Sequence, residues 1–308
     1  MVTTAERTET LASAIRKLAG EKNALILAHN YQREEVQAVA DYTGDSLELA
    51  RAAADTSAQI IVFCGVHFMA ESAAILNPEK KVLLPDPTAG CPMADMAEAG
   101  DLAAMRERHP DAAVVTYINS SAEVKALSDV CCTSANATRI VQRLDARRVI
   151  FVPDRNLGMW VQRFTDKEII QWKGFCPTHE RFSAEDLAEA KRANPDALVM
   201  VHPECRPEVI DMADEVLSTG QMVKFVRETD RAQIIVGTEE GMIHKLRSIA
   251  PGIEYILPSK ALVCPNMKKT TLEKVHAALV NEEPVVTVDP EVREKSLGCL
   301  RRMLELSG

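Results

Sequence analysis

The chain has 308 residues, a formal charge of −9 at pH 7, 46% hydrophobic and 26% charged residues, and eight cysteines. This composition excludes a disordered, collagenous or membrane-spanning chain, and a net acidic protein without a basic tract is a poor candidate for binding nucleic acid or an anionic membrane surface. Because no signal peptide or long apolar segment occurs, we expect a cytoplasmic protein whose cysteines are packing residues, metal or cluster ligands, or reactive thiols rather than disulfides.

The chain opens with a predicted helix over residues 6–19 and then repeats itself with a period of 85 to 88 residues. Each of three units begins with an apolar, strand-like run that ends in polar residues, namely LILAHNY (25–31), VVTYINS (114–120) and LVMVHPE (198–204). Equivalent positions 88 and 85 residues apart carry His29, Tyr117 and His202. The same register holds for an aspartate that follows each run, at Asp41, Asp129 and Asp214.

Each unit continues in the order strand, helix, short strand, helix, strand, helix, strand. The third-strand runs are rich in Val and Ile, as in QIIVFCG (59–65), RRVIFVP (147–153) and QIIVGTE (233–239). This alternation indicates βαβ crossovers and a parallel sheet covered on both faces. We therefore predict an α/β protein of three pseudo-threefold-related αβα sandwich domains, each with a small, mostly parallel sheet, around a central active site.

The predicted boundaries are 1–23 for the N-terminal helix, 24–100, 101–190 and 191–280 for the three units, and 281–308 for a C-terminal helix. We expect the linkers where Pro, Gly and charged residues collect, at 97–111 (AEAGDLAAMRERHPD) and 184–196 (AEDLAEAKRANPD).

One cysteine lies just past the last strand of each unit, and each precedes a proline: Cys91, Cys176 and Cys264. Threefold symmetry would bring their thiolates together, which indicates either a zinc site or an iron–sulfur cluster; ordinary buried thiols are the alternative. A cubane held by three cysteines leaves one iron open to act as a Lewis acid on substrate. The other five cysteines are better explained as packing residues: Cys64, Cys131, Cys132, Cys205 and Cys299.

Polar residues are predicted to meet at the carboxyl ends of the first strands, where parallel α/β units form their binding crevice. In the first and third units the pairs His29/Tyr31 and His202/Glu204 are two residues apart, so both members point to the same side of a strand. The Glu204 carboxylate could orient the His202 imidazole or raise its pKa. His179 is expected to lie beside the cysteines.

Hydroxyl residues begin the second helix of each unit, at Ser46, Ser134, Ser218 and Thr219. Each could be only an N-cap. Three helix N-termini around one axis would also form an anion-binding ring.

Many motifs, in order over residues 25–279, resemble those of the quinolinate synthase family: AHNYQ, GDSLELA, GVHFMAE, AGCPMADM, TYINSSAEVKA, CTSANA, VPDRNLG, GFCPTHE, VHPEC, STGQM, IVGTEEGMIHKL and CPNMKKTTLEKV. The resemblance implies a transferase of de novo NAD biosynthesis with one 4Fe-4S cluster per chain and three αβα domains. It implies condensation of iminoaspartate with dihydroxyacetone phosphate to quinolinate, with release of phosphate and water, and functional coupling to an L-aspartate oxidase.

The resemblance also implies roles for individual residues. The implied cluster ligands are Cys91, Cys176 and Cys264, and the implied catalytic residues are Tyr31, Tyr117, His202 and Glu204. The implied substrate contacts are His29, Ser46, Tyr117, Asn119, Ser134, His179, His202, Glu204, Ser218, Thr219 and Met267. The chain departs from some members of the family because its single Cys299 cannot form their C-terminal CxxC pair.

Two other functions remain open at this point. One is an aconitase-like iron–sulfur hydro-lyase acting on another hydroxy acid, and the other is a non-catalytic iron–sulfur or zinc sensor. A sensor has no need for a ring of polar residues at the strand ends, whereas both enzymes do.

Overall fold

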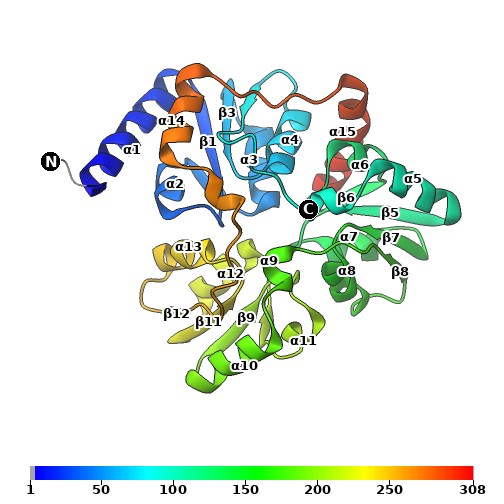
Figure 1. Cartoon of the computed structure of the whole chain (residues 1–308). Coiled ribbons are helices and arrows are strands. Elements are labelled where there is room, and N and C mark those ends of the chain that lie inside the picture. The colour runs from blue at the N-terminus through cyan, green and yellow to red at the C-terminus, as the bar shows by residue number, and fades with distance from the viewer. Residues whose placement is uncertain (1–3, 308) are drawn as a thin grey trace.

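The computed structural model describes residues 4–307, with side chains from residue 7 onward, and contains three four-stranded sheets. The three sheets have the same strand order, β2-β1-β3-β4, β6-β5-β7-β8 and β10-β9-β11-β12. Every pairing within them is parallel. Figure 1 shows the three units as three lobes around a common centre. The predicted α/β architecture of three αβα sandwiches is confirmed, and the sheets are wholly rather than mostly parallel.

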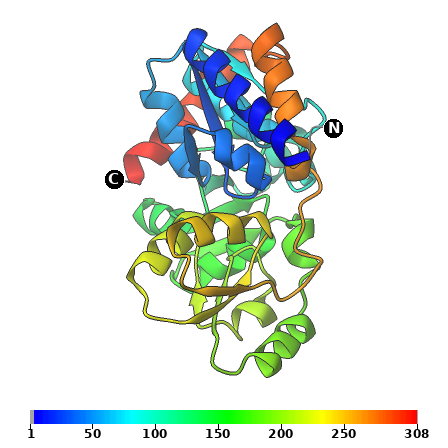
Figure 2. The same cartoon turned by 90° about the vertical axis from the view of Figure 1, so that its left-hand side faces the viewer.

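The first unit consists of β1 (Ala24–His29), α2 (Glu34–Val39), β2 (Tyr42–Gly44), α3 (Ser46–Asp55), β3 (Ile60–Cys64), α4 (His67–Leu76), β4 (Lys81–Leu83) and the short 3-10 helix η1 (Ala94–Met96). Its outer face is covered by α1 (Thr4–Glu21) and by a helix from much later in the chain, α14 (Leu272–Asn281). Figure 2 shows the chain passing from the third unit back to the first before α14.

The second unit consists of α5 (Ala99–Arg108), β5 (Ala112–Tyr117), α6 (Ala122–Ala126), β6 (Val130–Cys132), α7 (Ala137–Arg143), β7 (Arg148–Val152), α8 (Arg155–Gln162), β8 (Glu168–Gln171) and α9 (Pro177–Glu180). The C-terminal helix α15 (Pro290–Leu306) packs against α6, β6, α7 and α4, so it covers this unit and also touches the first.

The third unit consists of α10 (Ala184–Ala193), β9 (Leu198–Val201), α11 (Pro207–Ile210), β10 (Glu215–Val216), α12 (Thr219–Glu228), β11 (Gln233–Gly237), α13 (Gly241–Ile249), β12 (Glu254–Ile256) and η2 (Met267–Lys269). None of the helices within residues 4–307 combines the length and the apolar sequence that crossing a membrane requires.

Alternation along the first strand of each unit builds one shared core. Successive strand residues point to opposite faces of a sheet. The equivalent residues Leu27, Val115 and Met200 belong to one large apolar cluster to which all three units contribute. Their chain neighbours on the opposite faces belong to separate clusters, at Ile26, Val114 and Val199. The three sheets therefore pack their inner faces toward one centre.

The repeated aspartate joins the first two strands of each unit. The Asp41 carboxylate accepts a hydrogen bond from the Ile26 backbone N–H at 2.8 Å, and the Asp41 N–H donates to the Ile26 carbonyl at 2.9 Å. The same two bonds recur between the pairs Asp129/Val114 and Asp214/Val199. This local clamp explains why aspartate keeps its place in all three repeats.

One sequence expectation needs correction. The segments expected as linkers, 97–111 and 184–196, contain the helices α5 and α10, because their Ala, Glu, Arg and Lys residues are good helix formers and their Pro residues lie after the helix. The helix α14 lies within the range predicted for the third unit but packs on the first. The unit boundaries themselves stay a prediction.

Candidate active site

A cavity of about 130 Å³ lies where the three units meet. Most of the sequence-predicted site residues line it: His29, Tyr31, Ser46, Cys91, Tyr117, Asn119, Ser134, Cys176, His179, His202, Glu204, Thr219, Cys264 and Met267. The exception is Ser218, which is buried beneath the cavity wall and whose hydroxyl caps α12 by accepting from the Gln221 N–H.

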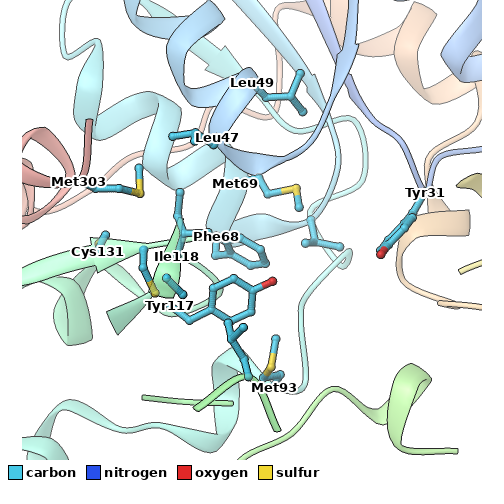
Figure 3. Packing of buried hydrophobic residues seen from close by; sticks show 14 of the residues in the cluster. Tyr31, Leu47, Leu49, Phe68, Met69, Met93, Tyr117, Ile118, Cys131 and Met303 are labelled. Carbon is cyan, nitrogen blue, oxygen red and sulfur yellow. The ribbon is translucent and has the colours of Figure 1, made fainter. Parts of the chain in front are cut away.

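The strand ends position the polar side chains as the repeat predicts. His29 ends β1, Tyr117 ends β5, and His202 directly follows β9. Figure 3 shows Phe68 packed beside Tyr117, with Tyr31 standing apart from both. The last four residues of each of these strands are buried, so the packed sheets fix the positions of these side chains.

The three equivalent cysteines all line the cavity, and backbone N–H groups of the short helical turn that follows each cysteine lower the pKa of its thiol. The donors are Met93 and Ala94 for Cys91, His179 for Cys176, and Asn266 and Met267 for Cys264. Burial nevertheless raises the pKa of Cys91 to about 12 and raises the pKa values of Cys176 and Cys264. Thiols that are this desolvated ionise when a metal binds them.

The three equivalent cysteine sulfurs do not all lie within 4.8 Å of one another, whereas the sulfur ligands of a single tetrahedral metal ion would. Tetrahedral zinc, with Zn–S bonds near 2.3 Å, would hold its sulfur ligands about 3.8 Å apart. Within residues 4–307, the group whose ligand atoms all lie within 4.8 Å of one another is Cys176, His179 and Glu204, which includes only one of the three cysteines. The wider spread of the three sulfurs, together with their backbone donors, is compatible with an iron–sulfur cluster.

Glu204 is the centre of a buried polar network. Its Oε1 accepts a hydrogen bond from the Tyr117 hydroxyl at 2.6 Å, and its Oε2 lies 2.8 Å from His179 Nδ1. Burial alone would raise the pKa of the Glu204 carboxyl, but His202, His179 and the Tyr117 hydroxyl hold that pKa below its ordinary value. The carboxylate is therefore ionised at neutral pH.

His29 and His202 are held in the same way at their equivalent positions. The Tyr31 N–H donates to His29 Nδ1 at 3.1 Å, and the Glu204 N–H donates to His202 Nδ1 at 3.3 Å. Each Nδ1 is thus an acceptor, which leaves the proton on Nε2. The Nε2 of His202 donates to the Ser134 hydroxyl at 3.1 Å.

Both imidazoles are neutral at pH 7. Burial lowers the pKa of His29 to about 4 and that of His202 to about 3, although Glu204 opposes both shifts. The Glu204 carboxylate raises the pKa of His202, as expected, but desolvation by burial is the larger effect and leaves that pKa below its ordinary value. The 3.6 Å contact between His202 Nδ1 and Glu204 Oε2 is accordingly not an ion pair.

Sequence reasoning missed Thr238, a fully buried residue just past β11. Its Oγ1 lies 2.6 Å from the Tyr31 hydroxyl and 2.9 Å from His179 Nε2. His179 Nδ1 lies 2.8 Å from Glu204 Oε2 and 3.2 Å from Cys176 Sγ, so Thr238 links Tyr31 to the histidine that contacts both of these groups. The only signal in the sequence was its place at the end of a third-strand run.

The hydroxyls at the second helices have different roles in the three units. Only Ser218 is an N-cap; α3 is capped by Asp45, and Ser134 stands before α7 and bonds to His202 instead. Asp45 was also missed. Its carboxylate accepts from the N–H groups of its own helix and from that of Gly220 in α12, and burial raises its pKa to about 6.

The five cysteines predicted to be packing residues are all buried and outside the cavity lining: Cys64, Cys131, Cys132, Cys205 and Cys299. Cys131 of β6 and Cys299 of α15 are in contact, with 3.0 Å between their sulfurs, where the C-terminal helix covers the second sheet. Sorting the cysteines by the repeat therefore separates those at the cavity from those in the core.

The sequence is similar to known proteins over nearly its whole length. Residues 13–305 match the family model described as quinolinate synthetase A protein. A quinolinate synthase of Dehalococcoides mccartyi (strain CBDB1) is 54% identical over 298 residues, which cover 97% of this chain and 99% of that protein. The quinolinate synthase of Geobacter sp. (strain M21) is also 54% identical, over 97% of this chain and 98% of its own length. That of Methanoregula boonei is 54% identical over 97% and 99% of the two chains.

Proposed function

The chain belongs to the quinolinate synthetase A family, and on that premise we propose that it condenses iminoaspartate with dihydroxyacetone phosphate to quinolinate, releasing phosphate and water. The observation that carries the proposal is the cavity at the meeting of the three units, which three equivalent cysteines and the polar strand ends line together. An L-aspartate oxidase acting in the same cytoplasm is the proposed source of iminoaspartate.

We assign the cofactor to the cysteines. Cys91, Cys176 and Cys264 would hold one 4Fe-4S cluster, and the backbone N–H groups that face their sulfurs would stabilise the thiolates. When bound, such a cluster supplies a Lewis-acidic iron that polarises a substrate oxygen.

Neutral donors would bind the two anionic substrates, since the chain has a net charge of −9 and both cavity imidazoles are uncharged. Fixed N–H and O–H dipoles stabilise an anion without attracting a competing counterion. The groups proposed for this role are the His29 imidazole, Asn119, Ser134 with His202, and Ser46 and Thr219 at the starts of α3 and α12.

Glu204 is the proposed general base. A carboxylate oxygen of Glu204 lies within 4.8 Å of the Cys176 sulfur, and its Oε2 can accept a proton while Tyr117 keeps its hydrogen bond to Oε1. Burial raises the pKa values of Tyr31 and Tyr117, so both hydroxyls keep their protons at neutral pH. The two tyrosines are therefore proposed as hydrogen-bond donors or acids, not as bases.

The test is anaerobic conversion of iminoaspartate and dihydroxyacetone phosphate to quinolinate by the purified protein. The variant Cys91→Ala should lose both activity and iron. The matched control is Cys64→Ala, which removes a buried thiol from the outer core of the same unit and should keep both. Full activity in Cys91→Ala would contradict the ligand assignment.

Metal analysis of the anaerobic protein separates the proposal from the alternatives. About four irons per chain are expected for the cluster. Stoichiometric zinc would contradict the proposal and favour a sensor. Four irons without quinolinate formation, but with dehydration of a hydroxy acid, would favour the hydro-lyase.

A further inference from the structure

Glu239 is a fully buried carboxylate that the proposed reaction does not use directly. It directly follows Thr238 at the end of β11 and has no exposed surface. Its Oε1 accepts a hydrogen bond from the Cys264 backbone N–H at 3.0 Å, and its Oε2 accepts one from the Gly241 N–H at 2.7 Å. One side chain thus ties the loop of a proposed cluster ligand to the start of α13.

Lys268 completes this arrangement from the other side. Its Nζ lies 2.9 Å from Oε1 and 3.1 Å from Oε2 of Glu239, and its side chain is only 14% exposed. The same Nζ donates to the Tyr31 carbonyl at 2.8 Å. A buried carboxylate persists when a cation and several donors satisfy it. Here the Cys264 N–H and the Lys268 ammonium come from the segment that carries Cys264, and the Gly241 N–H comes from the start of α13.

The other two cysteine loops are anchored by different means. In the loop before Cys91, the Asp86 carboxylate binds Thr88 and also Lys274 of α14. Before Cys176, the Gly174 carbonyl accepts from the Arg155 N–H. The Glu239 carboxylate, by contrast, binds the backbone N–H of the cysteine itself, so its charge lies close to that ligand.

We propose that Glu239 and Lys268 form a positioning pair that fixes the Cys264 loop, holds the Tyr31 carbonyl against it, and sets the local charge beside the cluster. This proposal rests on the proposed cluster ligation by Cys264. Groups that bind the ligands of a metal site orient those ligands and tune the metal, and losing one such partner typically costs 10–100-fold in metal affinity or activity.

Glu239→Gln tests the pair with little change of shape. The amide keeps an acceptor oxygen but removes the buried negative charge, which leaves Lys268 facing only the half-exposed Glu240 carboxylate at 3.7 Å among the ion pairs of the described residues. We expect iron loss to a chelator to become roughly 10–100-fold faster. The cluster should also become easier to reduce, with a more positive midpoint potential, because the remaining positive charge favours the reduced form.

The matched control is Glu240→Gln, which removes the same charge from the next residue. The Glu240 side chain is 45% exposed, and its Oε1 lies 3.7 Å from Lys268 Nζ. This control should keep the wild-type rate of iron loss and the wild-type potential, because an exposed charge is screened by solvent.

A second variant keeps the test decisive if Glu239→Gln does not fold. Lys268→Met removes the positive charge and should shift the midpoint potential in the opposite direction, to more negative values, while also accelerating iron loss. Lys269→Met, one residue along, is its control, because the Lys269 Nζ binds the Thr88 carbonyl and not Glu239. Opposite shifts of the potential separate a charge effect from general loosening of the loop.

All proteins would be purified and handled anaerobically, with iron loss followed by absorbance and the potential by a redox titration. Wild-type iron retention and an unshifted potential in Glu239→Gln or Lys268→Met would overturn the pair alone. A wild-type protein that binds no iron–sulfur cluster would overturn the proposed function and the role of the pair with it.

Discussion

Lys125 offers a sharp test of how the first two units are held together. The side chain is fully buried in α6, and its Nζ donates to the Ser120 carbonyl at 2.5 Å. It lies 3.9 Å from Oε2 of Glu71 in α4 and 5.7 Å from the centre of the Phe68 ring, so a charge pair is buried between the units. The perturbation is Lys125→Met, which keeps most of the side-chain volume and removes the charge.

The expected cost follows from the geometry of this pair. Removing one partner of a buried ion pair costs about 3–5 kcal/mol. The 3.9 Å separation is long for a hydrogen-bonded pair, so the low end, about 3 kcal/mol, is expected. For a chain of this size that corresponds to a fall in Tm of about 6 °C. The double variant Lys125→Met/Glu71→Gln should recover at least half of the loss, because it leaves no unpaired charge.

The penalty should depend on pH in a defined direction. Burial raises the pKa of Glu71, and Lys125 opposes that shift, so the pKa rises further in Lys125→Met. A carboxyl whose pKa is higher in the folded than in the unfolded protein stabilises the fold fully at pH values below its unfolded pKa of 4.5. This stabilisation is lost as the pH rises through the folded pKa. The Tm difference between variant and wild type should therefore be larger at pH 8 than at pH 5.

Thermal unfolding followed by circular dichroism at both pH values is the assay. The control is Lys295→Met, which removes an exposed lysine paired with Glu291 on α15 and should change the free energy of unfolding by less than about 0.5 kcal/mol. Equal Tm values for the two variants, or a Lys125→Met penalty that does not change with pH, would refute the reasoning.

Three further predictions follow from the site and its frame. Tyr117→Phe removes a hydrogen bond to an ionised carboxylate, worth about 1.5–3 kcal/mol, so kcat/KM for quinolinate formation should fall about 10–150-fold; an unchanged value would show that the Glu204 contact is not used. In Gly241→Ala the new Cβ would lie 2.8 Å from backbone atoms of Tyr31 in the first unit, so Tm should fall. Gly298→Ala places its Cβ in open space on α15 and should stabilise the protein by about 0.5–1 kcal/mol. A higher Tm for Gly241→Ala than for Gly298→Ala in thermal melts would contradict both expectations. Burial lowers the pKa of His29 to about 4, so as pH falls below 6.5 this histidine is protonated in the unfolded chain before it is protonated in the folded one. Between pH 7 and pH 5 the free energy of unfolding should therefore fall by about 2 kcal/mol more in wild type than in His29→Gln. Denaturant unfolding at the two pH values measures this difference. Parallel losses in the two proteins would sink this last prediction.

The repeat made most of the fold predictable from sequence. The fold depends largely on local patterns. Alternation of apolar residues places Leu27 and its equivalents on the inner faces of the sheets. The hydrogen bonds that Asp41 makes between strands recur because they need only two neighbouring strands. The convergence of Cys91, Cys176 and Cys264 also followed from the repeat, since equivalent loops of three like units face one centre. A feature that lies within one unit and recurs in the other two could therefore be placed from the sequence.

Contacts between units were the part that sequence patterns could not supply. Thr238 belongs to the site because Tyr31 and His179, which are 207 and 59 residues away in the chain, both contact its hydroxyl. The packing of α14 on the first sheet is of the same kind, because an amphipathic helix shows which face is buried but not which sheet buries it. The net pKa shift of His202 is a further example, because desolvation, which outweighs the expected effect of Glu204, is a property of the assembled units.

The three repeats share one backbone arrangement but carry different functional side chains at equivalent positions. His29, Tyr117 and His202 hold equivalent strand ends, and the position two residues later carries Tyr31, Asn119 and Glu204. Of these last three only Glu204 is a carboxylate, and it stands beside Cys176 and His179. A symmetric cavity would present the same groups to every ligand, whereas these equivalent positions carry a tyrosine, an asparagine and a carboxylate. Under the proposed function, this loss of equivalence would let one cavity bind two different anions and move a proton at one of the three positions.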